Sequence, residues 1–446
     1  MAFQRKIYQK LLDWKNEPKR IDALLIEGSR RVGKTTIVEE FAKNEYKNFL
    51  LLDFSVESET VKNLFYNLSD INNFFTNLFL AKQKILNKGD LIIFDEVQNF
   101  PLARQAIKHL VKDGRFDYIE TGSLLSIREN VENILIPSEE RRLEMYPMDF
   151  EEFLWAIGKR DLANTIRQCF ETSTSIRREI HSSLNMEYRK YLAIGGMPLA
   201  INVFLTSGDY MRVHQQKNNI CKLYKDDLHK HDLKFGTKCE KVWDALPAIL
   251  RKTSKRFVVA FENKNSRYSS LSKTFGDIVD SKILNMVNKI SEPIPGNELF
   301  LKDELFKLYC CDTGLLLTSI YKNQNVTINK IYQDIILGKS DANLGNIYES
   351  IVAQTLIANG YKPSYHAYNL EVDGKNKSFE IDFLIERNGK TTAIEVKSGK
   401  NFDTKSLNNL KIKYPQMKFE RFVISGKEFK KDGDKTYLPL YMAFCL

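Results

Sequence analysis

The stretch GSRRVGKTT carries residues suited to holding phosphates. Gly28 is followed by four residues and then by Gly33, Lys34 and Thr35, which matches G-x-x-x-x-G-K-[ST] in full. Backbone amides close around the phosphates, the lysine reaches the β- and γ-oxygens, and the threonine hydroxyl ligates Mg²⁺. The predicted nucleotide-binding residues here are Gly28, Ser29, Arg30, Arg31, Val32, Gly33, Lys34, Thr35 and Thr36. The sequence therefore predicts a nucleotide site with Mg²⁺ as cofactor.

Two carboxylates follow the apolar stretch LIIF directly. Asp95 is predicted to hold Mg²⁺ through water, and Glu96 to polarise the attacking water, so these two join Lys34 as predicted catalytic residues. Thr121 and Ser123 end the next predicted strand, YIETGS, and are candidate sensors of the γ-phosphate. The alternatives are a buried strand that emerges into an acidic turn, and a simple turn formed by Ser and Gly.

The elements around these residues have the order that a phosphate-binding loop requires. Leu24 to Glu27 predict an apolar strand before the loop, and Ile37, Val38, Phe41 and Ala42 fall on one face of a helix after it. Four apolar residues before Asp95 predict a second strand, buried on both faces of a parallel sheet. The N-terminal region is therefore predicted to be α/β, with a parallel sheet.

A second group of charged residues lies in EIDFLIERNGKTTAIEVKSGK. Asn388-Gly389 is a strong signal for a two-residue hairpin turn, and counting outward from it places Asp382 across from Glu395. Like charges on facing strands destabilise a sheet, whereas a divalent metal turns repelling carboxylates into ligands. A bound Mg²⁺ would therefore remove the repulsion between Asp382 and Glu395.

Alternation along the two strands gathers four charges on one face. Glu380 and Asp382 share that face, as do Glu395 and Lys397 across the turn. The other face is predicted to be apolar and comprises Ile381, Phe383, Ile394 and Val396. One alternative is a surface ladder in which Glu380 forms an ion pair with Lys397 and the other two acids are hydrated.

Glu395 and Lys397, with Glu395 thirteen residues after Asp382, resemble the active-site pattern of the restriction-endonuclease-like superfamily, PD-(D/E)xK. The resemblance implies that Asp382 and Glu395 hold the metal, that Lys397 orients or activates the attacking water, and that Glu349 of the preceding helix completes the metal ligands. A nuclease fold that has lost its activity and serves as an interaction module is the second alternative.

Motifs along nearly the whole chain resemble the bacterial and archaeal AAA-type P-loop ATPases with a DUF4143-type C-terminal region. They are GSRRVGKT, IIFDEVQNFP, YIETGSLLSI, ERRLEMYPMDFEEFL, YLAIGGMPLAI, LYCCDTGLL, GNIYES, EIDF and EVKSG. The resemblance implies ATP as the nucleotide, and no guanine-reading N/T-K-x-D string follows the loop. Ser29 departs from the family, which often has proline there, without consequence for phosphate binding. Arg141 and Arg142 are arginine-finger candidates by position only; we expect them instead to face solvent or to pair with neighbouring glutamates.

The predicted fold class is α/β, in four parts. Residues 1–149 form the P-loop AAA core, 150–209 a helical extension that breaks at Gly195-Gly196-Met197-Pro198, 210–322 a winged-helix domain, and 323–446 a smaller mixed α/β, restriction-endonuclease-like domain that begins with a helix around Glu349.

The winged-helix prediction depends on three helices followed by a strand. The helices are predicted over Val242–Leu250, from Ser269 to Phe275, and over Asp280–Ser291, and the strand over LFLKDELFKLYCCD. The third helix would present Lys282, Asn285, Asn288 and Lys289 to a phosphate backbone, or serve as a packing lid over the nucleotide.

The composition of the chain indicates which kinds of binding partner to expect. The net charge of +10 favours an acidic partner such as DNA, although a Lys-rich sequence can have the same charge without one. No apolar run is long enough for a membrane span, the start is charged rather than signal-like, and the six cysteines show no Cys-x-x-Cys spacing, so we expect a cytoplasmic protein without a membrane partner. His229 and His231 in a helix would point about 200° apart and could not share a metal.

Two functions are consistent with these motifs. In the first, ATP hydrolysis is coupled to nucleic acid binding or to metal-dependent DNA cleavage by the C-terminal domain. In the second, the chain is a nucleotide-dependent switch or scaffold, and its nuclease-like domain only binds a partner. ATP is the expected ligand in both, and a second copy of the chain is a candidate partner.

Overall fold

The computed structural model describes residues 2–18, 20–123, 137–231, 236–250, 276, 279–294, 296, 298–322, 327–339, 345–399 and 401–446. The chain divides into two compact units. The first is Met1–Tyr146 with Lys230–Asp232 and Asp280–Lys282, and the second is Pro147–His229, Leu233–Val279 and Ile283–Leu446. Within the described ranges, every helix is too short or too polar to cross a membrane.

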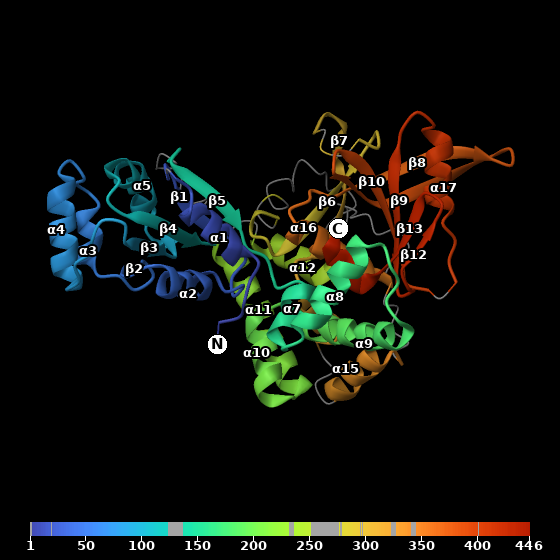
Figure 1. Cartoon of the computed structure of the whole chain (residues 1–446), viewed down its shortest axis with the longest axis horizontal. Helices are drawn as coiled ribbons and strands as arrows, with labels where there is room; N and C mark the ends of the chain where they lie inside the picture. Colours follow the sequence, from blue (N-terminus) through green and yellow to red (C-terminus); the bar gives the residue numbers. More distant parts are fainter. Residues whose placement is uncertain are drawn as a thin grey trace. The chain divides into compact units, whose positions relative to one another are not determined.

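The first unit contains a five-stranded, all-parallel sheet in the order β2-β3-β4-β1-β5 (Figure 1). Its elements are α1 Ile7–Lys15, β1 Ala23–Glu27, α2 Lys34–Glu45, β2 Phe49–Asp53, α3 Glu59–Leu64, α4 Ile71–Lys82, β3 Leu91–Asp95, the 3₁₀ helix η1 Val97–Asn99, α5 Pro101–Asp113, β4 Asp117–Gly122 and β5 Glu140–Glu144. The three predicted strands of this sheet and the helix after the loop are confirmed, and the parallel sheet has the form typical of P-loop nucleotide hydrolases.

Burial explains why these strands sit inside the sheet. Every residue of β1, β3 and β4 is buried, as expected for strands covered on both faces. One face packs an aromatic cluster in which the rings of Phe54, Phe65, Phe94 and Phe100 meet mostly edge to face. This rigid layer fixes the carboxyl ends of the strands, where the predicted phosphate-binding residues lie.

The second unit begins with helices and continues into a mixed sheet. Its helices are α7 Phe150–Ala156, α8 Arg160–Glu171, α9 Arg178–Ile194, α10 Pro198–Ser207, α11 Tyr210–His231, α12 Gly236–Leu250, α14 Thr313–Ile320, α15 Ile328–Leu337, α16 Gly345–Ala358 and α17 Lys405–Lys413, with 3₁₀ helices η3 Glu298–Phe300 and η5 Leu440–Cys445. The helical extension and its break after Ile194 are confirmed, as are the helices predicted around Val242–Leu250 and Glu349.

Eight strands form the second sheet, in the order β12-β13-β11-β10-β9-β8-β6-β7 (Figure 1). They are β6 Leu284–Ile290, β7 Leu301–Cys310, β8 Ser364–Val372, β9 Lys375–Arg387, β10 Lys390–Lys397, β11 Phe419–Ser425, β12 Lys430–Asp432 and β13 Lys435–Pro439. The hairpin register predicted from Asn388-Gly389 is confirmed from Arg387, which pairs with Lys390, as far as Phe383, which pairs with Ile394.

The helix predicted over Asp280–Ser291 is wrong, because Leu284–Ile290 is strand β6. β6 lies between β7 and β8 in the sheet, and Leu284 and Val287, which point to opposite faces of the strand, are both buried. Its buried apolar side chains therefore occur on both faces, and Ile283, Val287 and Ile290 have a spacing that imitates a helix. The strand predicted to follow is confirmed as β7. The predicted helix at Ser269–Phe275 lies outside the described residues.

Two of the family-like strings meet in a close backbone contact within the second unit. The Asp312 carboxylate accepts hydrogen bonds from the Gly196 amide, at 2.5 Å, and from the Leu315 amide at the start of α14, at 2.9 Å. A Cβ on Gly314 would lie 2.5 Å from the Cα of Gly195, so neither backbone could approach with a side chain present. YLAIGGMPLAI and LYCCDTGLL therefore have a packing role.

Candidate functional site

Lys34 lies inside the loop that the sequence assigns to phosphates. Its ammonium donates to the backbone oxygens of Gly28, at 3.0 Å, and Ser29, at 3.2 Å, and the side chain is buried. Burial lowers the pKa of Lys34 to about 8, although Glu96 and Asp95 act in the opposite direction. A desolvated ammonium held by neutral carbonyls is well placed to bind an anion.

The loop has the shape of a phosphate cradle. A Cβ at Gly28 would lie 2.2 Å from the backbone oxygen of Met145, and Gly33 has a left-handed φ of 99° at the start of α2. The Ser29 hydroxyl is buried and, among the described residues, has no hydrogen-bond partner. These observations fit an anion bound by the backbone at a helix N-terminus.

Arg5, which was not among the predicted site residues, contacts the backbone of this loop. Its guanidinium donates to the backbone oxygens of Val32, at 2.8 Å, and Tyr146, at 2.6 Å. The Met145 amide also donates to the Glu27 oxygen at 2.7 Å, just before the loop. No motif points to Arg5, because its role depends on a contact with residues far along the chain.

Thr35 and Asp95 meet at the end of β3, where a magnesium ion would be needed. The Thr35 hydroxyl donates to both carboxylate oxygens of Asp95, at 2.9 and 3.0 Å, and the Thr121 hydroxyl donates to the same carboxylate. Burial raises the pKa of Asp95, while the hydrogen bonds from Thr121 and Thr35 lower it. The hydroxyl and carboxylate oxygens fit the ligand preference of Mg²⁺.

Glu96 is held in a constrained position next to this corner. Its φ of 53° is in the left-handed region, which is uncommon for glutamate, and its amide donates to the Thr121 hydroxyl at 3.3 Å. The Gln98 side chain donates to the Glu96 carboxylate and accepts the Ser123 amide at 3.3 Å. Gln98, which the sequence did not single out, therefore links the predicted base to the end of β4, where Thr121 and Ser123 lie as expected.

The predicted polar residues Arg30, Arg31 and Thr36 lie at or near the surface, whereas Val32 is buried. Arg31 and Thr36 are exposed, and Arg30 is half-buried.

Arg141 forms ion pairs with Glu17 and Asp22, at 2.5 and 2.8 Å. The expected pairing with a neighbouring glutamate is found for Arg142, whose guanidinium lies 3.2 Å from Glu140.

A buried group of acids lies on the same strands, beside the loop. Arg104 and Glu140 form an almost fully buried bidentate ion pair, with distances of 2.6 and 2.7 Å. Glu120 is completely buried next to them, and its pKa is raised well above the ordinary value by burial and by Glu140, against the opposing effect of Arg104. Burial and the neighbouring Glu140 carboxylate therefore favour the protonated form of Glu120.

The C-terminal carboxylates take separate partners. Strand pairing in the hairpin ends at Phe383 and Ile394, one pair short of Asp382 and Glu395. Asp382 accepts the Val396 amide at 2.8 Å, whereas Glu395 forms an ion pair with Lys397 at 2.8 Å. The expected apolar residues of the hairpin are buried.

Glu349 and Glu380 have other partners again. Glu349 accepts the Tyr309 hydroxyl at 3.2 Å, and Glu380 forms an ion pair with Lys307 at 2.7 Å, not with Lys397. Within the described ranges, no three His, Cys, Asp or Glu side chains form a group that could hold a metal ion. The predicted ligands Glu349, Asp382 and Glu395 therefore do not fit a metal centre as they stand.

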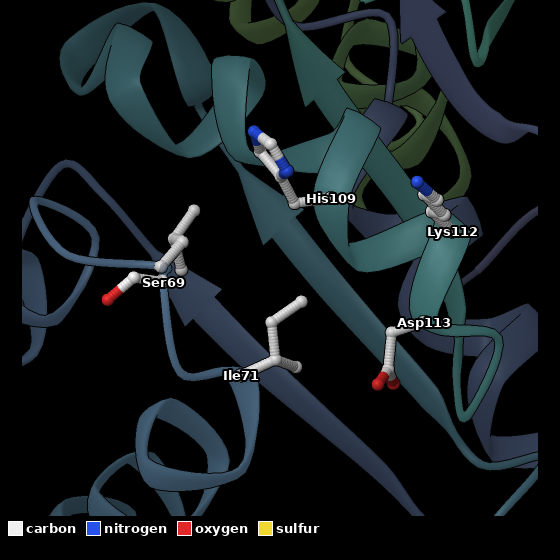
Figure 2. A pocket seen from close by; sticks show the side chains of 6 residues that line it. Ser69, Ile71, His109, Lys112 and Asp113 are labelled. Carbon is white, nitrogen blue, oxygen red and sulfur yellow. The ribbon is translucent and has the colours of Figure 1, made fainter.

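A surface hollow of about 550 Å³ occurs elsewhere in the first unit (Figure 2). It is lined by His109, Lys112 and Asp113 of α5 and by Ser69 and Ile71. None of its lining residues belongs to the phosphate-binding loop or to the Asp95 corner.

Three family models match successive parts of the chain. Residues 20–154 match an AAA domain, residues 185–325 a domain of unknown function, DUF8612, and residues 344–442 another domain of unknown function, DUF4143. The predicted resemblance to AAA domains is thus supported for residues 20–154, and the predicted DUF4143-type C-terminal region is confirmed by the match over residues 344–442. Its restriction-endonuclease-like character stays a prediction.

Similarity to individual proteins is remote. An uncharacterized protein of Methanocaldococcus jannaschii is 23% identical over 468 residues, covering 98% of this chain and 87% of that protein. A Walker-type ATPase of Pyrococcus abyssi has a TM-score of 0.42 at 14% identity, covering 72% of this chain and 96% of that one. The RuvB Holliday junction branch migration motor of Thermotoga maritima has a TM-score of 0.27 at 15% identity, covering 64% and 89%. These structural scores carry no conclusion about function.

Proposed function

We propose that the chain binds ATP with Mg²⁺ and hydrolyses it at the loop between β1 and α2. The observation that carries this proposal is the convergence of Lys34, Thr35, Asp95 and Glu96 at the carboxyl edge of one parallel sheet, beside a loop that only glycine allows at position 28. Nucleotides bind at this edge in open α/β sheets.

Each residue has a separate task in this proposal. Bound Mg²⁺ would neutralise charge on the phosphates. Lys34 would exchange its carbonyl partners for phosphate oxygens, and Thr35 and Asp95 would hold the metal. Glu96, kept in place by Gln98, would accept a proton from the attacking water.

The test is ATP turnover by the Lys34→Ala variant. We expect turnover to fall at least ~100-fold, because transition-state charge on the phosphates loses its buried cation. Lys43→Ala is the matched control, since Lys43 lies on the same helix and, within the described part of the chain, its ion-pair partner is Glu39 at the surface. Turnover by Lys34→Ala equal to that of the control would overturn the proposal.

We further propose that hydrolysis works as a switch and that the C-terminal domain binds a partner without cutting it. The separate partners of Asp382, Glu395 and Glu380 favour this function over metal-dependent DNA cleavage. Plasmid DNA incubated with Mg²⁺ or Mn²⁺ should therefore stay intact. Nicking by the wild-type protein that is lost in the Asp382→Ala, Lys397→Ala double variant would establish cleavage instead.

DNA is the partner that the net charge of +10 favours. If DNA is bound, ATP turnover should rise when DNA is added, and the rise should shrink steeply with added salt because counterion release drives such binding. ATP turnover that DNA leaves unchanged, with no DNA bound at low salt, would remove DNA as the partner.

A further inference from the structure

Lys307, on β7, is a charged residue buried within the second unit. Its side chain is only 1% exposed. The ammonium lies 2.7 Å from a carboxylate oxygen of Glu380 and 3.9 Å from one of Asp382, and 5.0 Å from the centre of the Tyr365 ring. A buried lysine is costly unless it is paired, so these contacts must balance its charge.

A third carboxylate acts on the same ammonium. Burial lowers the pKa of Lys307, but Glu349, Asp382 and Glu380 together outweigh this effect and raise the pKa. Tyr309, two residues along β7 and therefore on the same face, donates its hydroxyl to Glu349 at 3.2 Å. One cation from β7 is thus surrounded by acids from α16 and β9.

An irregularity in β9 gives Asp382 its place in this group. Ser364 pairs with Leu384 and His366 with Ile381, so β9 has one residue more than β8 between these pairs. Ile381 and Leu384 consequently pack in the same apolar cluster, although they are three residues apart. Asp382 lies in this irregular segment of β9, between Ile381 and Leu384. It is past the last residue pair of the β9–β10 hairpin, so it does not pair with Glu395.

We propose that Lys307 is the permanent cation of this carboxylate group: its ammonium takes the place that a divalent metal would occupy among Glu349, Glu380 and Asp382. The second unit then folds and acts without a metal at these residues. Glu395, the fourth predicted acid, is neutralised by Lys397. The inference is independent of ATP hydrolysis in the first unit, and either proposal can fail without the other.

The Lys307→Met variant tests the proposal, because methionine keeps much of the apolar stem and removes the charge. Nucleotide-free protein, freed of metal with EDTA, is titrated with MnCl₂ while bound Mn²⁺ is measured by electron paramagnetic resonance and the Tm by thermal unfolding. Wild-type protein should show no Mn²⁺ binding that Asp382→Asn removes. Lys307→Met should have a Tm lower by several degrees, and Mn²⁺ should raise that Tm and bind at one new site per chain.

Lys302→Met is the matched control on the same strand, because Lys302 is exposed. It should leave the Tm and Mn²⁺ binding unchanged. If Lys307→Met does not fold, Lys307→Met combined with Glu380→Gln should fold, because one negative charge is removed with the positive one. Mn²⁺ binding by the wild type that Asp382→Asn abolishes would overturn the proposal. So would a folded Lys307→Met variant with unchanged Tm and no Mn²⁺ response, or a double variant no more stable than the single one.

Discussion

Lys34 and Lys307 are both buried lysines near carboxylates, yet their surroundings differ in kind. Among the described residues, Lys34 donates to the backbone carbonyls of Gly28 and Ser29, and burial lowers its pKa to about 8. Lys307 lies against the carboxylate of Glu380, and the acids around it raise its pKa. Within the ranges that the structure describes, no carboxylate forms an ion pair with Lys34, so this lysine is suited to binding an anion. Lys307 already has an ion-pair partner in Glu380 and is suited to stabilising the fold.

The largest effect on the proposed ATP-hydrolysis site around Lys34 is expected from a change at Glu96. Glu96→Gln keeps the shape and the hydrogen-bonding capacity toward Gln98 but removes the base. We expect ATP turnover to fall by about 10²- to 10⁴-fold. ATP affinity, measured by equilibrium binding, should change little because the proposed phosphate-binding residues Lys34 and Thr35 are kept. The matched control is Glu39→Gln on the exposed side of α2, which should keep wild-type turnover. A variant that binds ATP normally and turns it over at the wild-type rate would exclude Glu96 as the base.

Removing the charge of Lys34 should stabilise the folded protein, whereas removing the charge of Lys307 should destabilise it. Lys34→Met removes a desolvated charge without an ion-pair partner, so the nucleotide-free protein should become more stable by about 2 kcal/mol at pH 7. Because the folded pKa of Lys34 is about 8 and the unfolded value is 10.5, the folded state binds fewer protons between these values. The destabilising effect of Lys34 on the folded protein should therefore decrease as the pH rises from 8 to 10.5.

Urea unfolding of the wild type and of Lys34→Met across this pH range measures the effect as a difference between the two proteins. Taking the difference cancels the other groups that titrate there. The gain in stability should be largest at pH 7 and should shrink toward pH 10.5. A variant less stable than the wild type at pH 7 would mean that the two carbonyl hydrogen bonds outweigh the desolvation of the ammonium.

The sequence predicted the first of these sites far better than the second. The residues from Gly28 to Thr35 are contiguous, so their loop follows from one motif, and Asp95 lies at the end of an unmistakable apolar strand. Arg5 and Gln98 could not be found in this way, because each acts through a contact that no local pattern encodes.

Local patterns failed in the second unit where strands are irregular or fully covered. The Asn388-Gly389 turn fixed the register as far as Phe383 and Ile394, but the extra residue in β9 ended the alternation just before Asp382. Lys307 lies on a strand remote in sequence from that hairpin, so no spacing within the hairpin could reveal that its acids have a cation of their own.

Gln98 allows a smaller test of how the first site is held. Gln98→Leu removes both the hydrogen bond to the Glu96 carboxylate and the one from the Ser123 amide. We expect kcat to fall about 10-fold, because Glu96 loses its orientation but keeps its proton affinity as a base. KM should change less than kcat, since the phosphate-binding residues are untouched. Gln98→Glu, measured alongside, should be no better than Gln98→Leu because it sets two carboxylates against each other. Unchanged kcat in Gln98→Leu would show that backbone geometry alone positions Glu96.

Glu120 extends the comparison to a buried carboxyl group whose pKa is raised. Its pKa is raised in the folded state by burial and by Glu140, so the folded protein retains a proton that the unfolded chain releases above its ordinary pKa of 4.5. The contribution of Glu120 to the free energy of unfolding is therefore fully present below pH 4.5. It declines as the pH rises from 4.5 through the raised pKa of the folded protein. Glu120→Gln carries no such proton and should be more stable than the wild type by about 1 kcal/mol at pH 8, with the advantage disappearing toward pH 4.5. Urea unfolding at several pH values measures this difference. An advantage that stays constant with pH would mean that Glu120 is ionised in the folded protein and that Arg104 serves Glu120 and Glu140 together, as Lys307 serves the acids of the second unit.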